Sequence, residues 1–143
     1  MKISIIGSGY VGLVSGAGFA EAGHNVLCMD IDAKRIASLR MGKSPLYEPG
    51  LDEMLADNIE REHLAFTTSL EAAVEHADAL LIAVGTPPSE DGSADLGHVL
   101  TVASGIGKCL SEHLLVIVKS TVPVGTCARV RATIQEQLDA RGE

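Results

Sequence analysis

The chain has 143 residues, of which 46% are hydrophobic and 3% aromatic, with a net charge of −8 and a mean hydropathy of +0.24. This length is enough for one domain with a hydrophobic core, while the acidic balance argues against a nucleic-acid partner. No apolar run approaches the roughly 18 residues of a membrane span, so we expect no membrane partner.

The cysteines and histidines do not form a recognisable framework. The chain has three cysteines that are far apart, without a Cys-x-x-Cys pair, and its five histidines lack the spacing of metal ligands. The N-terminus shows no signal peptide. We therefore expect a cytoplasmic protein with free thiols and without a metal site.

A glycine pattern follows the first predicted strand, the apolar run 3–6. The next residues, Gly7-Ser8-Gly9-Tyr10-Val11-Gly12, read Gly-x-Gly-x-x-Gly. In a dinucleotide-binding turn, Gly7 allows the tight turn, Gly9 lets backbone N–H groups approach a diphosphate, and Gly12 lets the helix lie against the strand. The start of a helix also offers unpaired N–H donors to an anion.

The context strengthens this pattern. A helix is expected over Tyr10–Ala22 and stops at Gly23, and a second strand over 25–29 ends in Asp30. Asp30 lies 23 residues after Gly7, close to the spacing of about 20 residues in dinucleotide-binding units. Its carboxylate would accept hydrogen bonds from ribose hydroxyls and repel a 2′-phosphate, which favours NAD over NADP. The alternative is a glycine-rich turn followed by a capping aspartate.

The rest of the chain alternates helices and strands. Helices are expected over about 33–41, 51–61, 70–76, 96–110 and 126–140, with caps at Asp32, Ser69 and Asp95, and strands over 64–67, 79–84 and 114–118. Five strands with helical crossovers predict an α/β fold, a doubly wound parallel sheet of the Rossmann-like kind with strand order 3-2-1-4-5. Such a sheet usually has a sixth strand, so we expect residues 1–143 to be the incomplete front part of a longer enzyme.

Ligands of such sheets bind beyond the carboxyl ends of the strands, between the first and fourth. Three segments should meet there: 7–12, 85–88 and 119–123. Thr86 and Thr121 each follow a strand, and their hydroxyls either bind a ribose, a carboxamide or a water, or cap the local turns.

The sequence leaves the roles of two cationic side chains and one thiol undecided. Lys119 is either a positive group near a ligand or a solvated lysine, and Arg35 lies along the adenine side of a cofactor or on the surface of its helix. Cys127 lies near a helix start, where the pKa of a thiol can fall, although packing is the favoured interpretation.

Several longer segments point to a family. The chain contains Ser44-Pro45 with Glu48-Pro49-Gly50-Leu51, then Val84-Gly85-Thr86-Pro87, Asp91-Gly92-Ser93-Ala94-Asp95-Leu96 and Lys119-Ser120-Thr121-Val122-Pro123-Val124-Gly125-Thr126. Together with the glycine loop, these segments closely resemble the NAD-binding domain of the UDP-glucose/GDP-mannose dehydrogenase family. The resemblance covers the entire chain.

The resemblance implies a two-step oxidation of a nucleotide-sugar primary alcohol to a carboxylate, with two NAD per turnover and a cysteine that forms a thiohemiacetal and then a thioester. It implies that Val11 contacts NAD through its backbone and Asp30 binds the adenosine ribose. Thr86 and Thr121 would contact the nicotinamide half, and Thr121 would also help to hold an active-site water. The family often has a lysine where this chain has Arg35.

The resemblance also places the nucleophile in a later segment, because no cysteine here matches its context. We therefore expect this chain to bind NAD without catalysing the reaction, and the full-length enzyme to be a homo-oligomer serving polysaccharide biosynthesis. Two segments, 93–99 and 119–126, lean toward UDP-glucose as the substrate over GDP-mannose or UDP-N-acetylmannosamine. A β-hydroxyacid or 6-phosphogluconate dehydrogenase and a stand-alone NAD-binding module are the more distant alternatives.

Overall fold

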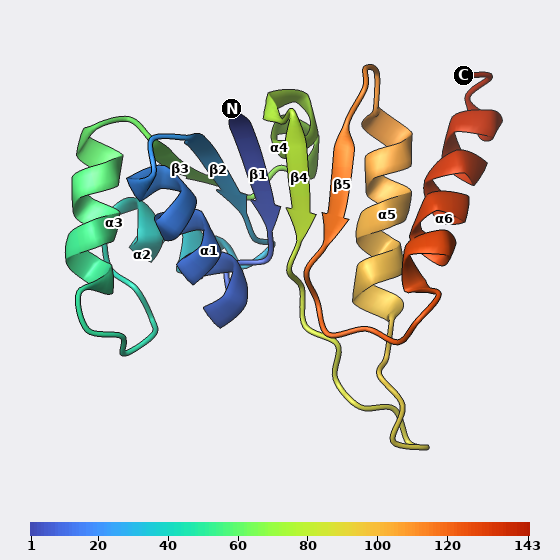
Figure 1. Cartoon of the computed structure of the whole chain (residues 1–143), viewed down its shortest axis with the longest axis horizontal. Coiled ribbons are helices and arrows are strands. Elements are labelled where there is room, and N and C mark those ends of the chain that lie inside the picture. Colours follow the sequence, from blue (N-terminus) through green and yellow to red (C-terminus); the bar gives the residue numbers. More distant parts are fainter.

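The computed structural model describes residues 1–143 and contains a five-stranded parallel sheet with helices on both faces (Figure 1). The strands are β1 (Lys2–Ile6), β2 (Asn25–Met29), β3 (Leu64–Thr67), β4 (Ala79–Ile82) and β5 (Leu115–Val118). The helices are α1 (Tyr10–Glu21), α2 (Ala33–Arg40), α3 (Leu51–Glu60), α4 (Leu70–His76), α5 (Gly97–Cys109) and α6 (Thr126–Ala140). The strand order is β3-β2-β1-β4-β5, so the predicted doubly wound parallel sheet is confirmed.

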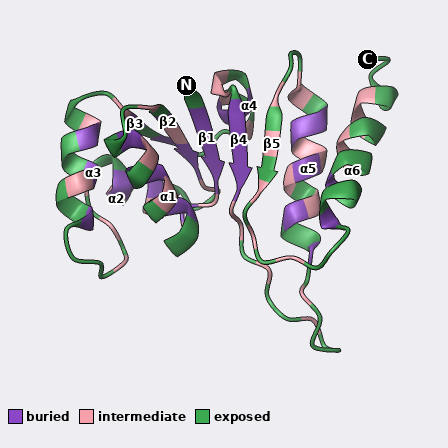
Figure 2. Ribbon diagram, viewed as in Figure 1, coloured by how far each residue is buried: buried purple, intermediate pink, exposed green.

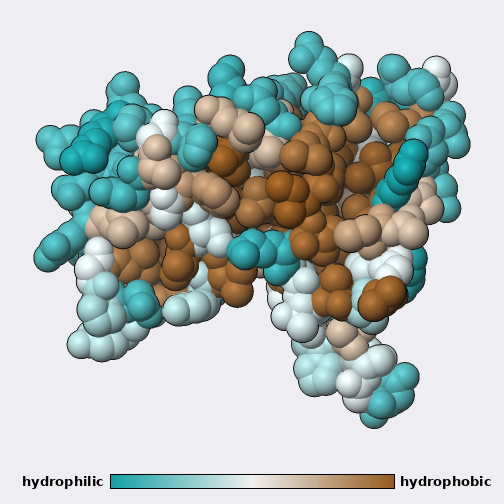
Figure 3. All heavy atoms as spheres, in the orientation of Figure 1, coloured by the Kyte–Doolittle hydropathy of each residue, from teal (hydrophilic) through white to brown (hydrophobic).

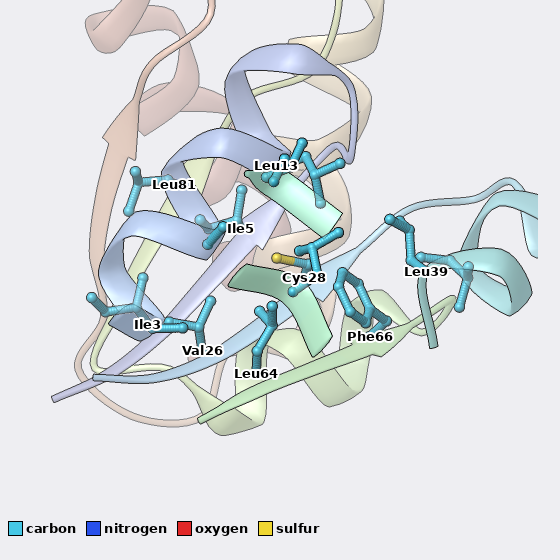
Figure 4. Packing of buried hydrophobic residues seen from close by; sticks show 14 residues of the cluster. Ile3, Ile5, Leu13, Val26, Cys28, Leu39, Leu64, Phe66 and Leu81 are labelled. Atoms are coloured by element: carbon cyan, nitrogen blue, oxygen red, sulfur yellow. The ribbon is translucent and has the colours of Figure 1, made fainter. Parts of the chain in front are cut away.

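The sheet buries apolar side chains on both faces, because neighbouring residues of a strand point to opposite sides. Ile5 and Cys28 belong to a core that α1, α2 and α3 cover, and Ile6 and Met29 belong to a core on the other face, covered by α4, α5 and α6. Figure 4 shows the first core from close by, and Figure 2 shows that β1 and β4 are buried almost throughout. The central strands are therefore held from both sides.

The fifth strand is the least covered. Leu115 and Ile117 are 54% and 39% exposed, and β5 has no strand on its outer side. Figure 3 shows apolar side chains gathered across the middle of this view, over the region of β4 and β5 in Figure 1. Helix α6 packs beside α5, where Gly107 lets the backbone of Ile134 come close. None of the helices is long and apolar enough to cross a lipid bilayer.

The predicted helix caps are present at two of three positions. Asp32 and Ser69 are the N-caps of α2 and α4, and their side chains accept hydrogen bonds from backbone N–H groups of the first turn. The prediction for Asp95 is off by one residue, because Leu96 is the N-cap of α5. Asp95 still accepts a hydrogen bond, at 2.8 Å, from the backbone N–H of Gly97.

Strand β4 ends two residues earlier than predicted. Ala83 still donates its backbone N–H to the carbonyl of Ile6 at 2.8 Å. The carbonyl of Val84, by contrast, accepts a hydrogen bond from the hydroxyl of Ser120 at 2.7 Å instead of from a backbone N–H. A side chain therefore replaces the backbone ladder at the point where β4 stops.

Helix α1 lies unusually close to the strands beneath it. A Cβ atom at Gly12 would overlap the carbonyl oxygen of Gly7, and one at Gly16 would lie 2.6 Å from Sγ of Cys28. Gly7 itself has a φ of +105°, in the region that favours glycine. At Gly18, on the exposed side of the same helix, a Cβ would meet no atom within 4 Å.

We predict opposite effects of alanine at two positions of α1. Gly12→Ala should lower the free energy of unfolding by about 3 kcal/mol, because the new methyl group collides with backbone that cannot rotate away. Gly18→Ala should raise it by roughly 0.5 to 1 kcal/mol, because alanine favours the helix and meets nothing. Urea unfolding of both variants measures the difference, and equal midpoints would contradict the close approach of α1.

Candidate functional site

The carboxyl ends of the strands lie on the lower edge of the sheet in Figure 1, where the loops after β1, β2, β4 and β5 meet. At this edge α1 begins without a side-chain cap and without an acidic residue in its first turn. The first backbone bond of the helix runs from the N–H of Leu13 to the carbonyl of Gly9. The N–H groups of Tyr10, Val11 and Gly12 therefore have no partner within the helix, and they form a site suited to an anion.

Gly9 keeps this site open. A Cβ atom built on Gly9 meets no atom of the chain within 4 Å, so the space above it is free. Gly7 turns the chain sharply and Gly12 allows the close packing of the helix, as described above. All three glycines thus occupy positions that fit the predicted diphosphate turn.

The carboxylate of Asp30 is held in place before any ligand arrives. Its Oδ2 accepts the backbone N–H of Ser8 at 2.9 Å, and its Oδ1 accepts that of Asp32 at 2.9 Å. The side chain is only 12% exposed. A carboxylate has about four acceptor positions, so it retains capacity for hydroxyl donors. Asp32, and not Asp30, is the N-cap of α2.

Arg35 contacts Asp30 instead of pointing freely into solvent. Its Nη1 lies 3.4 Å from Oδ2 of Asp30, and its side chain is 37% exposed. Of the two interpretations left open by the sequence, the structure favours the one that places Arg35 at the site. Asp30, which Arg35 contacts, also lines an adjacent cavity.

That cavity is apolar and has a volume of about 260 Å³. Beside Asp30 it is lined chiefly by residues at the ends of β1 and β2, in the loop after β4 and in helices α4 and α5: Ile6, Met29, Ile31, Leu70, Val84, His98, Thr101 and Val102. Its size and apolar walls suit a planar heterocycle such as a purine. The α4 and α5 residues carry no motif and have the spacing of ordinary amphipathic helices, so their place in this cavity could not be predicted from the sequence.

A second hollow of about 260 Å³ lies on the other side of the glycine loop. We call it the polar hollow, because Thr86, Lys119, Ser120 and Thr121 help to line it. It is lined by the start of α1 and by the loops after β4 and β5: Gly9, Tyr10, Val11, Ala83, Val84, Gly85, Thr86, Lys119, Ser120 and Thr121. The three segments expected to meet at this edge therefore do so. The hydroxyl of Thr86 donates to the carbonyl of Thr121 at 2.8 Å, so it joins the two loops and does not cap its own turn.

The two hollows and the glycine loop form one continuous arrangement. The apolar cavity lies beside Asp30, the free N–H groups of α1 lie at the loop, and the polar hollow lies beyond them. This order matches the parts of a dinucleotide, which has a purine nucleoside, a diphosphate and a second nucleoside. The residues present fit such a ligand.

The three thiols lie away from this arrangement. Cys28 is fully buried in the first core, and burial raises its pKa to about 12. Cys109 donates to the carbonyl of Gly105 within α5, and burial raises its pKa as well. Cys127 is exposed on α6, which contradicts the interpretation that it is packed. The structure brings together no group of three or more His, Cys, Asp or Glu side chains that could hold a metal ion.

Comparison with known proteins places these features in a family. Residues 1–143 match the family model described as UDP-glucose/GDP-mannose dehydrogenase family, NAD binding domain. The UDP-glucose 6-dehydrogenase of Pseudomonas aeruginosa is 50% identical over 141 residues, which are 99% of this chain and 31% of that enzyme. The UDP-glucose 6-dehydrogenase TuaD of Bacillus subtilis is 46% identical over 140 residues, 98% of this chain and 30% of that enzyme.

Solved structures of similar proteins agree with this match. A GDP-mannose dehydrogenase from Pseudomonas aeruginosa superimposes with a TM-score of 0.92 at 38% identity, over 96% of this chain and 32% of that one. A UDP-glucose dehydrogenase from Pyrobaculum islandicum gives 0.91 at 43% identity, over 96% and 33%. The chain thus spans about a third of the length of the relatives it matches.

We predict that Asp30→Asn weakens NAD binding about 10- to 100-fold, because a charged acceptor of ribose hydroxyls is lost. The preference for NAD over NADP should shrink as well, because the negative charge that repels a 2′-phosphate is gone. Asp32→Asn is the matched control, since asparagine caps a helix as well as aspartate does, and NAD affinity should stay within about twofold. Calorimetric titration checks both variants. Equal affinity of the unchanged chain for NAD and NADP would refute this role of Asp30.

Proposed function

Because the chain belongs to the UDP-glucose/GDP-mannose dehydrogenase family and is its NAD-binding domain, we propose that it supplies the cofactor site of an enzyme that oxidises a nucleotide sugar. The observation that carries this proposal is the Asp30 carboxylate, held beside both the apolar cavity and the glycine loop. UDP-glucose is the substrate we favour, because relatives with that activity are 50% and 46% identical to this chain. GDP-mannose is the second candidate, supported by the structural match at a TM-score of 0.92.

Each part of the site has a role in this proposal. The N–H groups of Tyr10, Val11 and Gly12 bind the diphosphate, and Asp30 accepts the hydroxyls of the adenosine ribose. The apolar cavity takes the adenine, and Arg35 contacts Asp30 beside it. Thr86 and Thr121, which share the wall of the polar hollow, contact the nicotinamide half.

The oxidation of a primary alcohol to a carboxylate removes four electrons, so two NAD molecules each accept one hydride. A cysteine that holds the substrate between the two oxidations would be supplied by sequence outside these 143 residues, because no thiol here lines either hollow. In this proposal Thr121 helps to hold the water that hydrolyses the thioester. Within the proposal, the chain alone is an NAD-binding module and the complete protein is the enzyme.

The remaining expectations about the whole protein belong to the same proposal. We propose that it works as a homo-oligomer in the cytoplasm, and that its nucleotide-sugar acid serves polysaccharide biosynthesis. The three free cysteines are compatible with a reducing compartment.

We predict that the 143-residue chain binds NAD but produces no NADH from UDP-glucose, GDP-mannose or UDP-N-acetylmannosamine, measured by absorbance at the NADH band. We also predict the activity of a chimera in which this chain replaces the matching third of the Pseudomonas aeruginosa UDP-glucose 6-dehydrogenase. This chimera should oxidise UDP-glucose. The same chimera with Asp30→Ala should lose most of its activity at low NAD concentration. NADH production by the chain alone would contradict the proposal that the nucleophile lies outside these 143 residues. A chain that does not fold, or that does not bind NAD, would overturn the proposed function.

We also predict that the thiols react with iodoacetamide in the order Cys127, Cys109, Cys28. Cys127 is exposed, whereas Cys28 is buried with a pKa of about 12 and can react only when the chain unfolds. Peptide mass spectrometry after timed labelling at pH 8 gives the three rates. NAD should not protect Cys127, because that residue lies away from the site, and strong protection would contradict the site described here.

A further inference from the structure

Two hydroxyl groups extend the pairing of β4 and β5 beyond the end of the sheet. Past the last paired residues, the hydroxyl of Ser120 donates to the carbonyl of Val84 at 2.7 Å, and the hydroxyl of Thr86 donates to the carbonyl of Thr121 at 2.8 Å. The two bonds run in opposite directions between the same two loops. Ser120 also donates its backbone N–H to the carbonyl of Ile82 at 3.1 Å.

We propose that Ser120 is a positioning residue for cofactor binding: it holds the loops after β4 and β5 at the spacing that the nicotinamide half of NAD requires. The inference rests on the proposed function, which assigns the polar hollow to that half of the cofactor. Ser120 acts through the carbonyl of Val84 and through its neighbour Thr121.

The bond from Thr86 limits what that residue offers to a ligand. A hydroxyl has one proton, and Thr86 gives it to the carbonyl of Thr121. Toward the hollow, Thr86 can therefore only accept hydrogen bonds, from groups such as a carboxamide N–H or a ribose hydroxyl. This role depends on the spacing of the two loops, because Thr86 would regain a free proton if they separated.

Ser120 is separate from the structures that hold the domain together. It belongs to neither hydrophobic core, and β4 and β5 stay paired by their own backbone bonds. On the adenine side, the Asp30 carboxylate is held separately, by the backbone N–H groups of Ser8 and Asp32. Val84 is the one residue that lines both hollows, whereas Thr86, Ser120 and Thr121 line only the polar hollow. Removing the Ser120 hydroxyl should therefore disturb chiefly the nicotinamide half of the site.

The test compares NAD with ADP, which lacks the whole nicotinamide riboside, by calorimetric titration of the chain. In Ser120→Ala the affinity for NAD should fall about five- to tenfold, the effect of one part-buried hydrogen bond, while the affinity for ADP stays within about twofold. Ser120→Thr keeps the hydroxyl and should restore NAD binding. Ser111→Ala is the matched control, because Ser111 lies between α5 and β5 at the opposite edge of the sheet.

The outcomes separate the two proposals. An equal loss of NAD and ADP affinity in Ser120→Ala would show a general structural role and overturn the inference, as would unchanged NAD affinity. An unchanged chain that binds ADP as tightly as NAD would overturn it too, because the polar hollow would then contribute nothing to cofactor binding. An unchanged chain that binds neither ligand would instead contradict the proposed function.

Discussion

The contact between Gly12 and the carbonyl of Gly7 is the constraint on which the rest of this structure depends. The helix can start directly above the end of β1 only because Gly12 has no side chain, and Gly16 continues the close packing over Cys28. The same contact serves two purposes. It closes the first core between α1 and the sheet, and it aims the unpaired N–H groups of the helix start at the edge where the loops meet. Stability and ligand binding therefore depend on one packing distance.

At that edge, hydrogen bonds from side chains take the place of hydrogen bonds between backbone groups. Within the sheet, backbone groups bind one another in a regular ladder, and beyond it side chains take over: Asp30 binds two backbone N–H groups, and Ser120 and Thr86 bind carbonyls across two loops. These bonds fix the polar groups before a ligand arrives. Less ordering is then required on binding, which favours affinity.

Much of this fold follows from local patterns in the sequence. The apolar runs of the strands, the caps at Asp32 and Ser69, and the glycine loop followed by Asp30 are all local signals. The strand order follows from the rules for doubly wound sheets. The end of β4 was mispredicted because a hydroxyl 36 residues away, on Ser120, replaces the expected backbone partner. The apolar cavity was missed for a similar reason. His98 and Thr101 reach it from α5 and Leu70 from α4, and only the folded chain shows that these helices meet beside Asp30.

Because β1 lies in the middle of the sheet, its pairing is completed only late in the synthesis of the chain. Ile3 pairs with Val26 on one side and with Ala79 on the other, so the second partner of the first strand is synthesised 76 residues after it. At about 5 to 20 residues per second, this takes roughly 4 to 15 s on the ribosome. Apart from Leu81, every buried member of the first core lies between Ile3 and Phe66, so that core can begin to gather early. One edge of β1 nevertheless stays open until β4 emerges, and during this interval the nascent chain is most exposed to pairing with the wrong strand.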